Sequence, residues 1–297
     1  IIGAASGTVM TQSLVDSSYG AVLQPSGTGA LEISAIATGT DGVIWAVTGC
    51  DLRFLPPGDG GGALINWGEY QFCSSSSDKA TDILVNADNV IISTGTNGVY
   101  VIEYNLSSNQ SQIGIQGITR WDSGNFLASN RITDLQMMGN QLLISTENAG
   151  ISRRDLATST WLSRWSTGNT LASNNVLGTS VSDGWLHVLA GNTLQSYEIS
   201  SGIFRAQETM PGLGLLDSAV SISSWPSGIG FRGPTNGMSI IIDSTGVMAM
   251  QHEDAPAGVE YLVSSPVTDP MRLAVSIEDS EDGQIWVAGD TTIDRFN

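Results

Sequence analysis

The chain has 297 residues, of which 29 are Asp or Glu and only 11 are Lys or Arg, so its formal net charge at pH 7 is −18. This acidity excludes a nucleic-acid binder that neutralises phosphates, and it disfavours adsorption to an anionic membrane surface. A hydrophobic content of 41% with eight Trp is enough for a sizeable core. No apolar run approaches the length of a membrane span, so direct membrane insertion is not expected.

Short alternating or apolar runs follow one another along the chain, separated by Gly, Asn, Asp and Ser. In chain order the clearest runs are residues 33–37, 43–47, 83–85, 90–92, 142–144, 185–189 and 284–288. Asp41-Gly42 lies between two such runs, which is a strong hairpin pattern because both turn residues tolerate positive φ. No window of about a dozen residues has helical spacing, so we predict an all-β chain.

An internal repeat indicates the architecture. Residues 120–130 recur as residues 164–174, at an offset of 44, with eight of the eleven positions identical. A period of roughly 40–50 residues holding four short strands is typical of a β-propeller blade. Second strands of the repeats are expected near Trp45, Ile92, Ile144, Val188, Phe231 and Trp286. We therefore predict a β-propeller with six blades, while a further apolar run at 259–263 keeps a seven-bladed ring open.

One propeller domain is expected to fill residues 1–297. Its repeats are predicted to begin near residues 30, 76, 127, 171, 215 and 269. Residues 292–296 then form the third strand of the last repeat, which lacks an outer strand of its own. We expect an N-terminal strand, around residues 8–14 or 19–23, to close the ring, with residues 1–29 serving as this closing strand and lead-in.

Several residues in the repeats follow a known pattern. The order is Leu127-Ala128-Ser129-Asn130, Ile132, Thr133-Asp134, an apolar strand at 142–144, Ser145-Thr146, Gly150 and Arg153-Arg154-Asp155. It resembles the two-component regulator propeller repeat, and the turn and Trp-bearing strand at 41–47 and 282–287 are similar to the same family. The resemblance implies a propeller, often extracytoplasmic, that serves as a sensor or binding module and mostly has no catalytic site. It carries over no ligand identity.

The chain has two cysteines, Cys50 and Cys73. An even count in an acidic chain rich in Ser, Thr, Asn and Gly fits an oxidising compartment, where one disulfide would close a loop of about 23 residues. Two buried free thiols are the alternative. The first interpretation predicts an extracellular, cell-surface or periplasmic location.

The duplicated segment supplies the candidate ligand-binding residues, which are Arg120, Trp121, Asn125, Arg164, Trp165 and Asn169. Each Arg-Trp pair is expected to end the outer strand of one blade, and the loop after it leads to the next blade. Trp offers an apolar face to a sugar ring or a peptide side chain, while Arg and Asn offer hydrogen bonds. The same residues also suit packing between blades, so both interpretations stay open.

Metal and catalytic patterns are sparse. Glu278, Asp279 and Asp282 beside a Gly turn resemble half of a calcium loop, so this run is either a solvated acidic turn or a weak Ca²⁺ site. No other cofactor is expected. His187 and His252 lack the spacing of a zinc site, and no Gly-x-Ser-x-Gly nucleophile elbow occurs. We therefore assign no catalytic residue.

Together these patterns favour a non-enzymatic extracytoplasmic propeller that binds a glycan or a protein, within a larger surface or sensor protein. One alternative is a propeller-type carbohydrate hydrolase or lyase that uses carboxylates as acid and base. The other is a structural module that packs against copies of itself.

Overall fold

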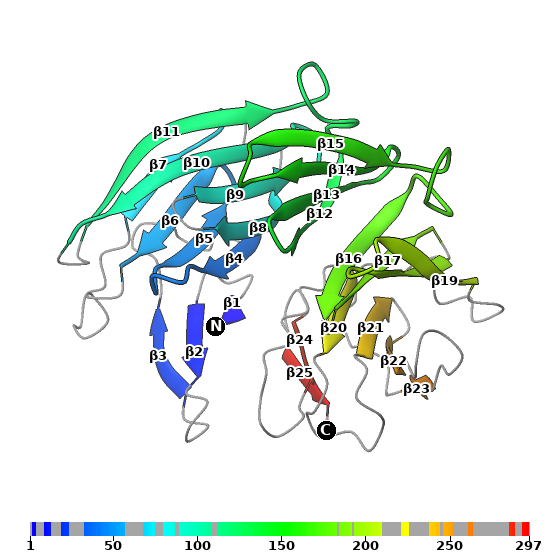
Figure 1. The fold of residues 1–297 in the computed structure, drawn as a ribbon. Coiled ribbons are helices and arrows are strands. Elements are labelled where there is room, and N and C mark those ends of the chain that lie inside the picture. Colours follow the sequence, from blue (N-terminus) through cyan, green and yellow to red (C-terminus); the bar gives the residue numbers. More distant parts are fainter. Residues whose placement is uncertain are drawn as a thin grey trace. The chain divides into compact units, whose positions relative to one another are not determined.

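The structure is a computed structural model of the chain (Figure 1). It describes residues 2–3, 9–12, 19–23, 33–56, 68–74, 80–86, 89–108, 112–182, 184–191, 193–209, 221–225, 238–243, 246–251, 261–263, 285–288 and 293–296. Every regular element among these residues is a β-strand. All strand pairs are antiparallel and join neighbours in the chain, which is the pattern of successive hairpins.

Five four-stranded sheets follow one another along the chain. The first contains β4 (Ala35–Thr38), β5 (Ile44–Thr48), β6 (Asp51–Leu55) and β7 (Gly68–Gln71). The second contains β8 (Ala80–Asn86), β9 (Asn89–Thr94), β10 (Val99–Leu106) and β11 (Ile113–Trp121). The third contains β12 (Ile132–Met138), β13 (Gln141–Thr146), β14 (Gly150–Asp155) and β15 (Thr160–Trp165).

The remaining strands form two further sheets of four and two smaller ones. The fourth sheet contains β16 (Val176–Ser182), β17 (Trp185–Ala190), β18 (Thr193–Glu198) and β19 (Ile203–Thr209). The fifth contains β20 (Ser221–Trp225), β21 (Met238–Asp243), β22 (Gly246–Gln251) and β23 (Tyr261–Val263). The smaller sheets are β1 (Ile2–Gly3), β2 (Val9–Gln12) and β3 (Tyr19–Leu23), and β24 (Ile285–Ala288) with β25 (Ile293–Phe296).

The all-β prediction is confirmed, and several strands lie where the sequence predicts them. Trp45, Ile92, Ile144 and Val188 all lie in the second strand of a four-stranded sheet. Phe231 lies outside the described residues, and β21 takes the second place in the fifth sheet. The apolar run near residue 260 is the outer strand β23 of that sheet. Ring closure by β2 or β3 and the number of blades stay predictions.

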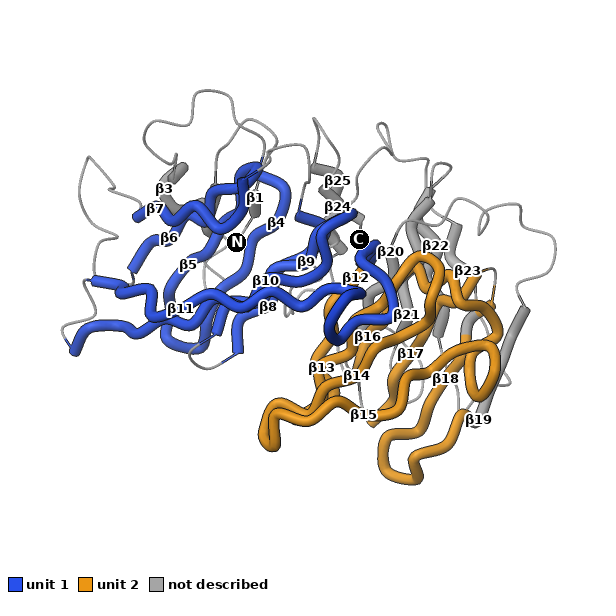
Figure 2. The backbone as a smooth tube through the Cα atoms, turned by 90° about the horizontal axis from the view of Figure 1, so that it is seen from above, with its two compact units in different colours: residues 1–133 blue, residues 134–297 orange. Residues whose placement is uncertain are grey.

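The chain divides into two compact units, Ile1–Thr133 and Asp134–Asn297, with the boundary inside β12 (Figure 2). In the first unit, apolar side chains of the first two sheets pack into one core that includes Trp45, Ile92 and Tyr104. In the second unit, Leu143, Trp165 and other side chains of the third sheet pack against the fourth. A single domain over the whole chain, with the six repeat starts given above, also stays a prediction.

The hairpin pattern Asp41-Gly42 forms a turn between β4 and β5, as predicted. Gly42 has a φ of 82°, a backbone conformation that glycine adopts without strain. The amide of Gly39 donates to the carbonyl of Val43 at 2.9 Å and closes the turn. The Asp41 side chain accepts the amide of Val43 and also the hydroxyl of Tyr104 in the second sheet. One acidic residue therefore fixes the turn and ties two sheets together.

Candidate functional site

The candidate binding residues fall at equivalent places in the two copies of the repeat. Arg120 and Trp121 end β11, and Arg164 and Trp165 end β15; both are the outer strands of their sheets. Each strand is followed by a ten-residue loop that leads to the first strand of the next sheet. We call residues 122–131 the first loop and residues 166–175 the second loop.

Each loop is folded by the asparagine that the sequence singles out. In the first loop, the Asn125 side-chain oxygen accepts the amide of Asp122 at 2.8 Å, and its Nδ2 donates to the carbonyl of Arg120 at 3.1 Å. Asn169 in the second loop makes the same two bonds, to the amide of Ser166 and the carbonyl of Arg164, both at 2.8 Å. Both polar atoms of each side chain are therefore used within the loop.

A second asparagine completes each loop. The side-chain oxygen of Asn130 accepts the amide of Ser123 at 2.6 Å, and that of Asn174 accepts the amide of Thr167 at 2.9 Å. The carbonyls of the same two asparagines accept the amides of Gly98 and Gly150, which belong to β-turns of the adjoining sheets. Each loop is thus held both internally and to a neighbouring turn, so its backbone is preorganised.

The two tryptophans are core residues in this structure. Trp121 and Trp165 are each only 5% exposed. The Trp165 ring lies 5.0 Å from the ring of Tyr197 and 5.5 Å from that of Phe204, both in the fourth sheet. The Arg153 guanidinium lies 4.1 Å from the Trp165 ring centre, and burial lowers the pKa of this arginine from its usual value. The geometry favours the packing interpretation, because rings enclosed in this way offer little surface for a ligand to stack on.

The arginines of the repeat remain on the surface. The Arg120 side chain is 42% exposed, although its Nε donates to the carbonyl of Asn97 at 3.0 Å and its guanidinium lies 3.5 Å from the Asp122 carboxylate. Arg164 is also exposed. A guanidinium has five N–H donors, so Arg120 is held in place and still has hydrogen-bonding capacity for a ligand.

Among the positions at which the two loops differ, one combines a change of residue type with a change of exposure, and the pattern of repeated residues does not single it out. Phe126 is 50% exposed, whereas its counterpart Thr170 is half-buried. Thr170 contributes to its own loop: its hydroxyl donates to Asn169 at 2.8 Å, and its carbonyl accepts Nε2 of the buried Gln195. Comparison of the two copies position by position would have found Phe126, since it is a large apolar residue where the duplicate has a small polar one.

A buried carboxylate joins the third and fourth sheets. Asp134 in β12 accepts the amide of Thr179 in β16 at 2.9 Å and the Thr179 hydroxyl at 2.6 Å. Burial raises the pKa of Asp134 to about 6, and the two hydrogen bonds from Thr179 only partly offset this effect. The Asp134 carboxylate therefore holds the third sheet to the fourth.

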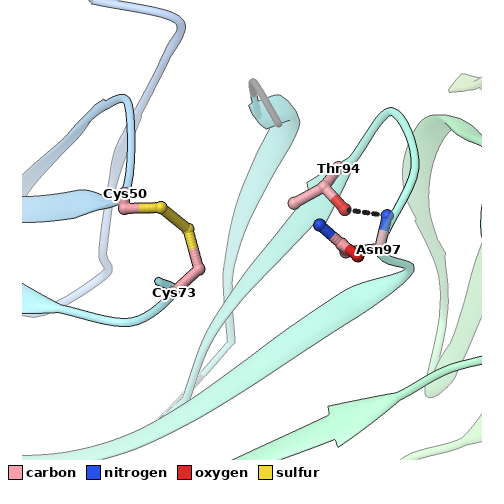
Figure 3. The surroundings of a disulfide bond; sticks show 4 residues. All are labelled: Cys50, Cys73, Thr94 and Asn97. Carbon is pink, nitrogen blue, oxygen red and sulfur yellow. Dashed lines mark hydrogen bonds between the residues drawn. A yellow bond between two sulfur atoms is a disulfide. The ribbon is translucent and has the colours of Figure 1, made fainter. Parts of the chain in front are cut away.

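Cys50 and Cys73 form a disulfide that ties the turn after β5 to the end of β7 (Figure 3).

His187 is 2% exposed, and its Nδ1 lies 3.1 Å from the hydroxyl of Ser196 on the neighbouring strand. Glu278, Asp279, Asp282 and His252 lie outside the described residues. Within the described residues, no three His, Cys, Asp or Glu side chains gather as they would around a metal ion.

Comparison with known proteins identifies the fold. No protein-family model matches the chain, and no curated protein sequence does. A chain of the mitotic checkpoint complex shares 11% identity over 98% of this chain and 83% of its own length, with a TM-score of 0.63. The WD40 repeats of RRP9 share 9% identity over 96% of this chain and 82% of theirs, also with a TM-score of 0.63.

A third solved structure is similar over a smaller part of its own length. PorZ, an essential surface component of the type-IX secretion system of Porphyromonas gingivalis, shares 12% identity over 90% of this chain and 33% of its own, with a TM-score of 0.54.

WD40 repeats are propeller blades, and four-stranded antiparallel sheets repeated along the chain are the same architecture. The described residues include no helix suited to crossing a membrane. The chain therefore has a β-propeller fold.

Proposed function

We propose that the chain is a non-catalytic interaction module that binds a protein ligand at the loops that follow the outer strands. The structure of the first loop supports this proposal most directly. It presents the exposed ring of Phe126 on a backbone fixed by its own asparagines, close in sequence to the exposed Arg120 and Arg131. Aromatic and arginine side chains are the residues most enriched at the energetic centres of protein interfaces.

A protein ligand suits this surface better than a glycan. Sugar binding would rely on the flat faces of Trp121 and Trp165, and both rings are enclosed by neighbouring side chains. A single phenylalanine with arginines nearby suits an apolar pocket on another protein. PorZ, one of the similar structures, is a component of the type-IX secretion system, and another belongs to the mitotic checkpoint complex.

We place the module outside the cytoplasm, within a larger surface or sensor protein. The Cys50–Cys73 disulfide supports this location, since such bonds persist in oxidising compartments. The likeness of residues 127–155 to the two-component regulator propeller repeat points the same way, as does the surface location of PorZ. The proposal assigns no catalytic residue: the carboxylates of Asp41, in the turn before β5, and Asp134, in β12, are engaged in hydrogen bonds that hold the fold.

The test is a binding measurement with the intact 297-residue chain. The immobilised chain is used to capture proteins from the cell-surface fraction of the organism that makes it, and each captured protein is purified and titrated against the free chain. We expect one protein to bind saturably. A panel of polysaccharides is assayed in parallel for binding and for release of reducing ends. Release of saccharide products, or the absence of saturable protein binding, would contradict the proposal.

A further inference from the structure

The two loops provide an internal control for what each residue does. They share eight of eleven residues over 120–130 and 164–174, and they make the same asparagine hydrogen bonds. Leu127 and Leu171, which follow the differing position, are both buried. The second loop adopts this fold with Thr170 where the first has Phe126, so the fold of the loop does not require a phenylalanine there.

Phe126 belongs to an exposed segment with unusual composition for this chain. Among the described residues, three large hydrophobic side chains are clearly exposed: Ile118 at 42%, Phe126 at 50% and Ile203 at 51%. Two of them fall within nine residues, at the end of β11 and in the loop that follows it. We call residues 118–131 the first-loop patch.

The charge of the first-loop patch is opposite to that of the chain. The patch holds two of the 11 cationic residues, Arg120 and Arg131, and one of the 29 acidic residues, Asp122. Both arginines are exposed. A partner with an acidic surface is repelled by the chain as a whole, with its net charge of −18, and finds local attraction at this segment. The local charge of the patch therefore directs an acidic partner to this segment of the chain.

We infer that the first-loop patch recognises a protein whose surface has an apolar pocket rimmed by carboxylates, with Phe126 entering the pocket and Arg120 and Arg131 pairing with the rim. This inference rests on the proposed function. The fixed loop backbone and the bond from Arg120 to Asn97 lower the entropy cost of presenting these side chains to the partner. The second loop, with Thr170 in place of the ring, does not take this role.

Photo-crosslinking tests the inference in the intact chain. The photoreactive residue p-benzoyl-phenylalanine is placed at position 126 in one variant and at position 203 in a control variant, since Ile203 is equally exposed. We expect position 126 to crosslink to one acidic protein, and position 203 not to. The purified partner should then bind Phe126→Thr at least about tenfold more weakly than the wild type. Its binding to Arg131→Gln should lose part of its salt dependence.

The outcomes separate this inference from the proposed function. Phe126→Thr introduces the residue of the sister loop, and an unchanged melting temperature confirms that it is folded. If a protein binds saturably and Phe126→Thr binds it as the wild type does, the patch is not the contact, while the proposed function stands. If position 126 crosslinks only to a second copy of the chain, self-association replaces the partner inferred here. If neither position crosslinks and no protein binds saturably, both proposals fail.

Discussion

Asparagine side chains reinforce the backbone turns in the loops of the repeat. Asn125 and Asn169 each use their amide group as both acceptor and donor, and so link the arginine near the end of the outer strand to the residue that starts the loop. An asparagine can do this because its short side chain carries one acceptor and two donors at its end. Aspartate in the same place offers no donor.

Asn169→Ala should therefore destabilise the protein although residue 169 is exposed. The substitution removes three hydrogen bonds, those with the amide of Ser166, the carbonyl of Arg164 and the hydroxyl of Thr170, and water must replace them. We therefore expect the free energy of unfolding to fall by about 1–2 kcal/mol. Urea unfolding of the variant and the wild type measures this loss of stability. Ser163→Ala is the matched control, because Ser163 is an exposed residue of β15 close to the second loop. It should change the free energy of unfolding by less than about 0.5 kcal/mol. Equal effects of the two variants would show that Asn169 is not a structural residue.

Asp134 makes stability depend on pH. Its pKa of about 6 in the folded state lies above the ordinary value of 3.8, so the folded state binds this proton more tightly than the unfolded state does. The free energy of unfolding should fall as pH rises from about 4 to about 6, by at most about 3 kcal/mol from this group, and stay lower above that range.

Asp134→Asn isolates this contribution from the titration of the other carboxylates. An amide oxygen still accepts the hydrogen bonds from Thr179, but the side chain has no proton to lose. We expect the stability of Asp134→Asn to fall less than that of the wild type between pH 4 and pH 6, as measured by thermal unfolding across that range. Parallel pH profiles for the two proteins would rule out Asp134 as the source.

At the scale of elements, the turns between second and third strands explain the repeated Ser-Thr and Gly. Thr146 donates to the carbonyl of Gly150 at 2.7 Å and accepts the amide of Ala149. In the second sheet, Thr94 donates to the carbonyl of Gly98 and accepts the amide of Asn97; Figure 3 shows the second of these bonds. Gly150 has a φ of 81°, and a Cβ there would collide with the carbonyl oxygen of Trp165. The motif is thus a closed turn that packs against the end of the outer strand.

Gly150→Ala should be more destabilising than Gly139→Ala. Both glycines have positive φ, so each alanine costs about 1–2 kcal/mol in backbone strain, but a Cβ at Gly139 meets nothing within 4 Å. The collision at Gly150 adds to that cost, and we expect the urea midpoint of Gly150→Ala to be clearly the lower of the two. If the two variants unfold together, the close approach to Trp165 is unimportant.

The disulfide fixes the ends of a long segment in the first sheet. It joins residues 23 apart in the sequence, and in the unfolded chain such a closed loop loses conformational freedom worth about 3 kcal/mol. We expect the double variant Cys50→Ser with Cys73→Ser to melt at a lower temperature than the oxidised wild type. The wild type should lose stability in reductant, and the double variant should not respond to it. A wild type that is insensitive to reduction would contradict this role.

The outer strands carry irregularities that limit edge-to-edge pairing. The pairing of third with outer strand shifts register at Glu103/Tyr104, Ile151/Arg153 and Ser196/Tyr197. Such bulges twist an edge strand and interrupt its row of free hydrogen-bonding groups. This feature weighs against association through strand edges and favours recognition by loops and side chains.

The strands and the repeat could be predicted from the sequence because alternation, β-branched residues and Asp-Gly turns act locally. The role of Trp121 and Trp165 could not, because a packed ring and a binding ring require the same residue type, and only tertiary contacts distinguish them. The roles of Asn125 and Asn169 could not be predicted either, because an asparagine that binds a ligand and one that holds a loop are the same residue type. Phe126 could not be identified from the repeated residues, because it stands at one of the positions where the two copies differ.

Across the whole chain, the excess of acidic residues and the small number of cationic residues determine which molecules the protein attracts or repels. A net charge of −18 favours solubility and repels acidic molecules in general. The first-loop patch, with Arg120 and Arg131, is a local exception. We therefore expect a partner that approaches this segment and whose binding weakens as salt screens the arginines.

Recognition through Phe126 is tested by calorimetry of the protein captured at position 126, which gives its affinity for the wild-type chain and for Phe126→Thr. We expect the affinity for Phe126→Thr to be at least about tenfold lower, with an unchanged melting temperature. Equal affinities in two equally stable proteins would contradict it.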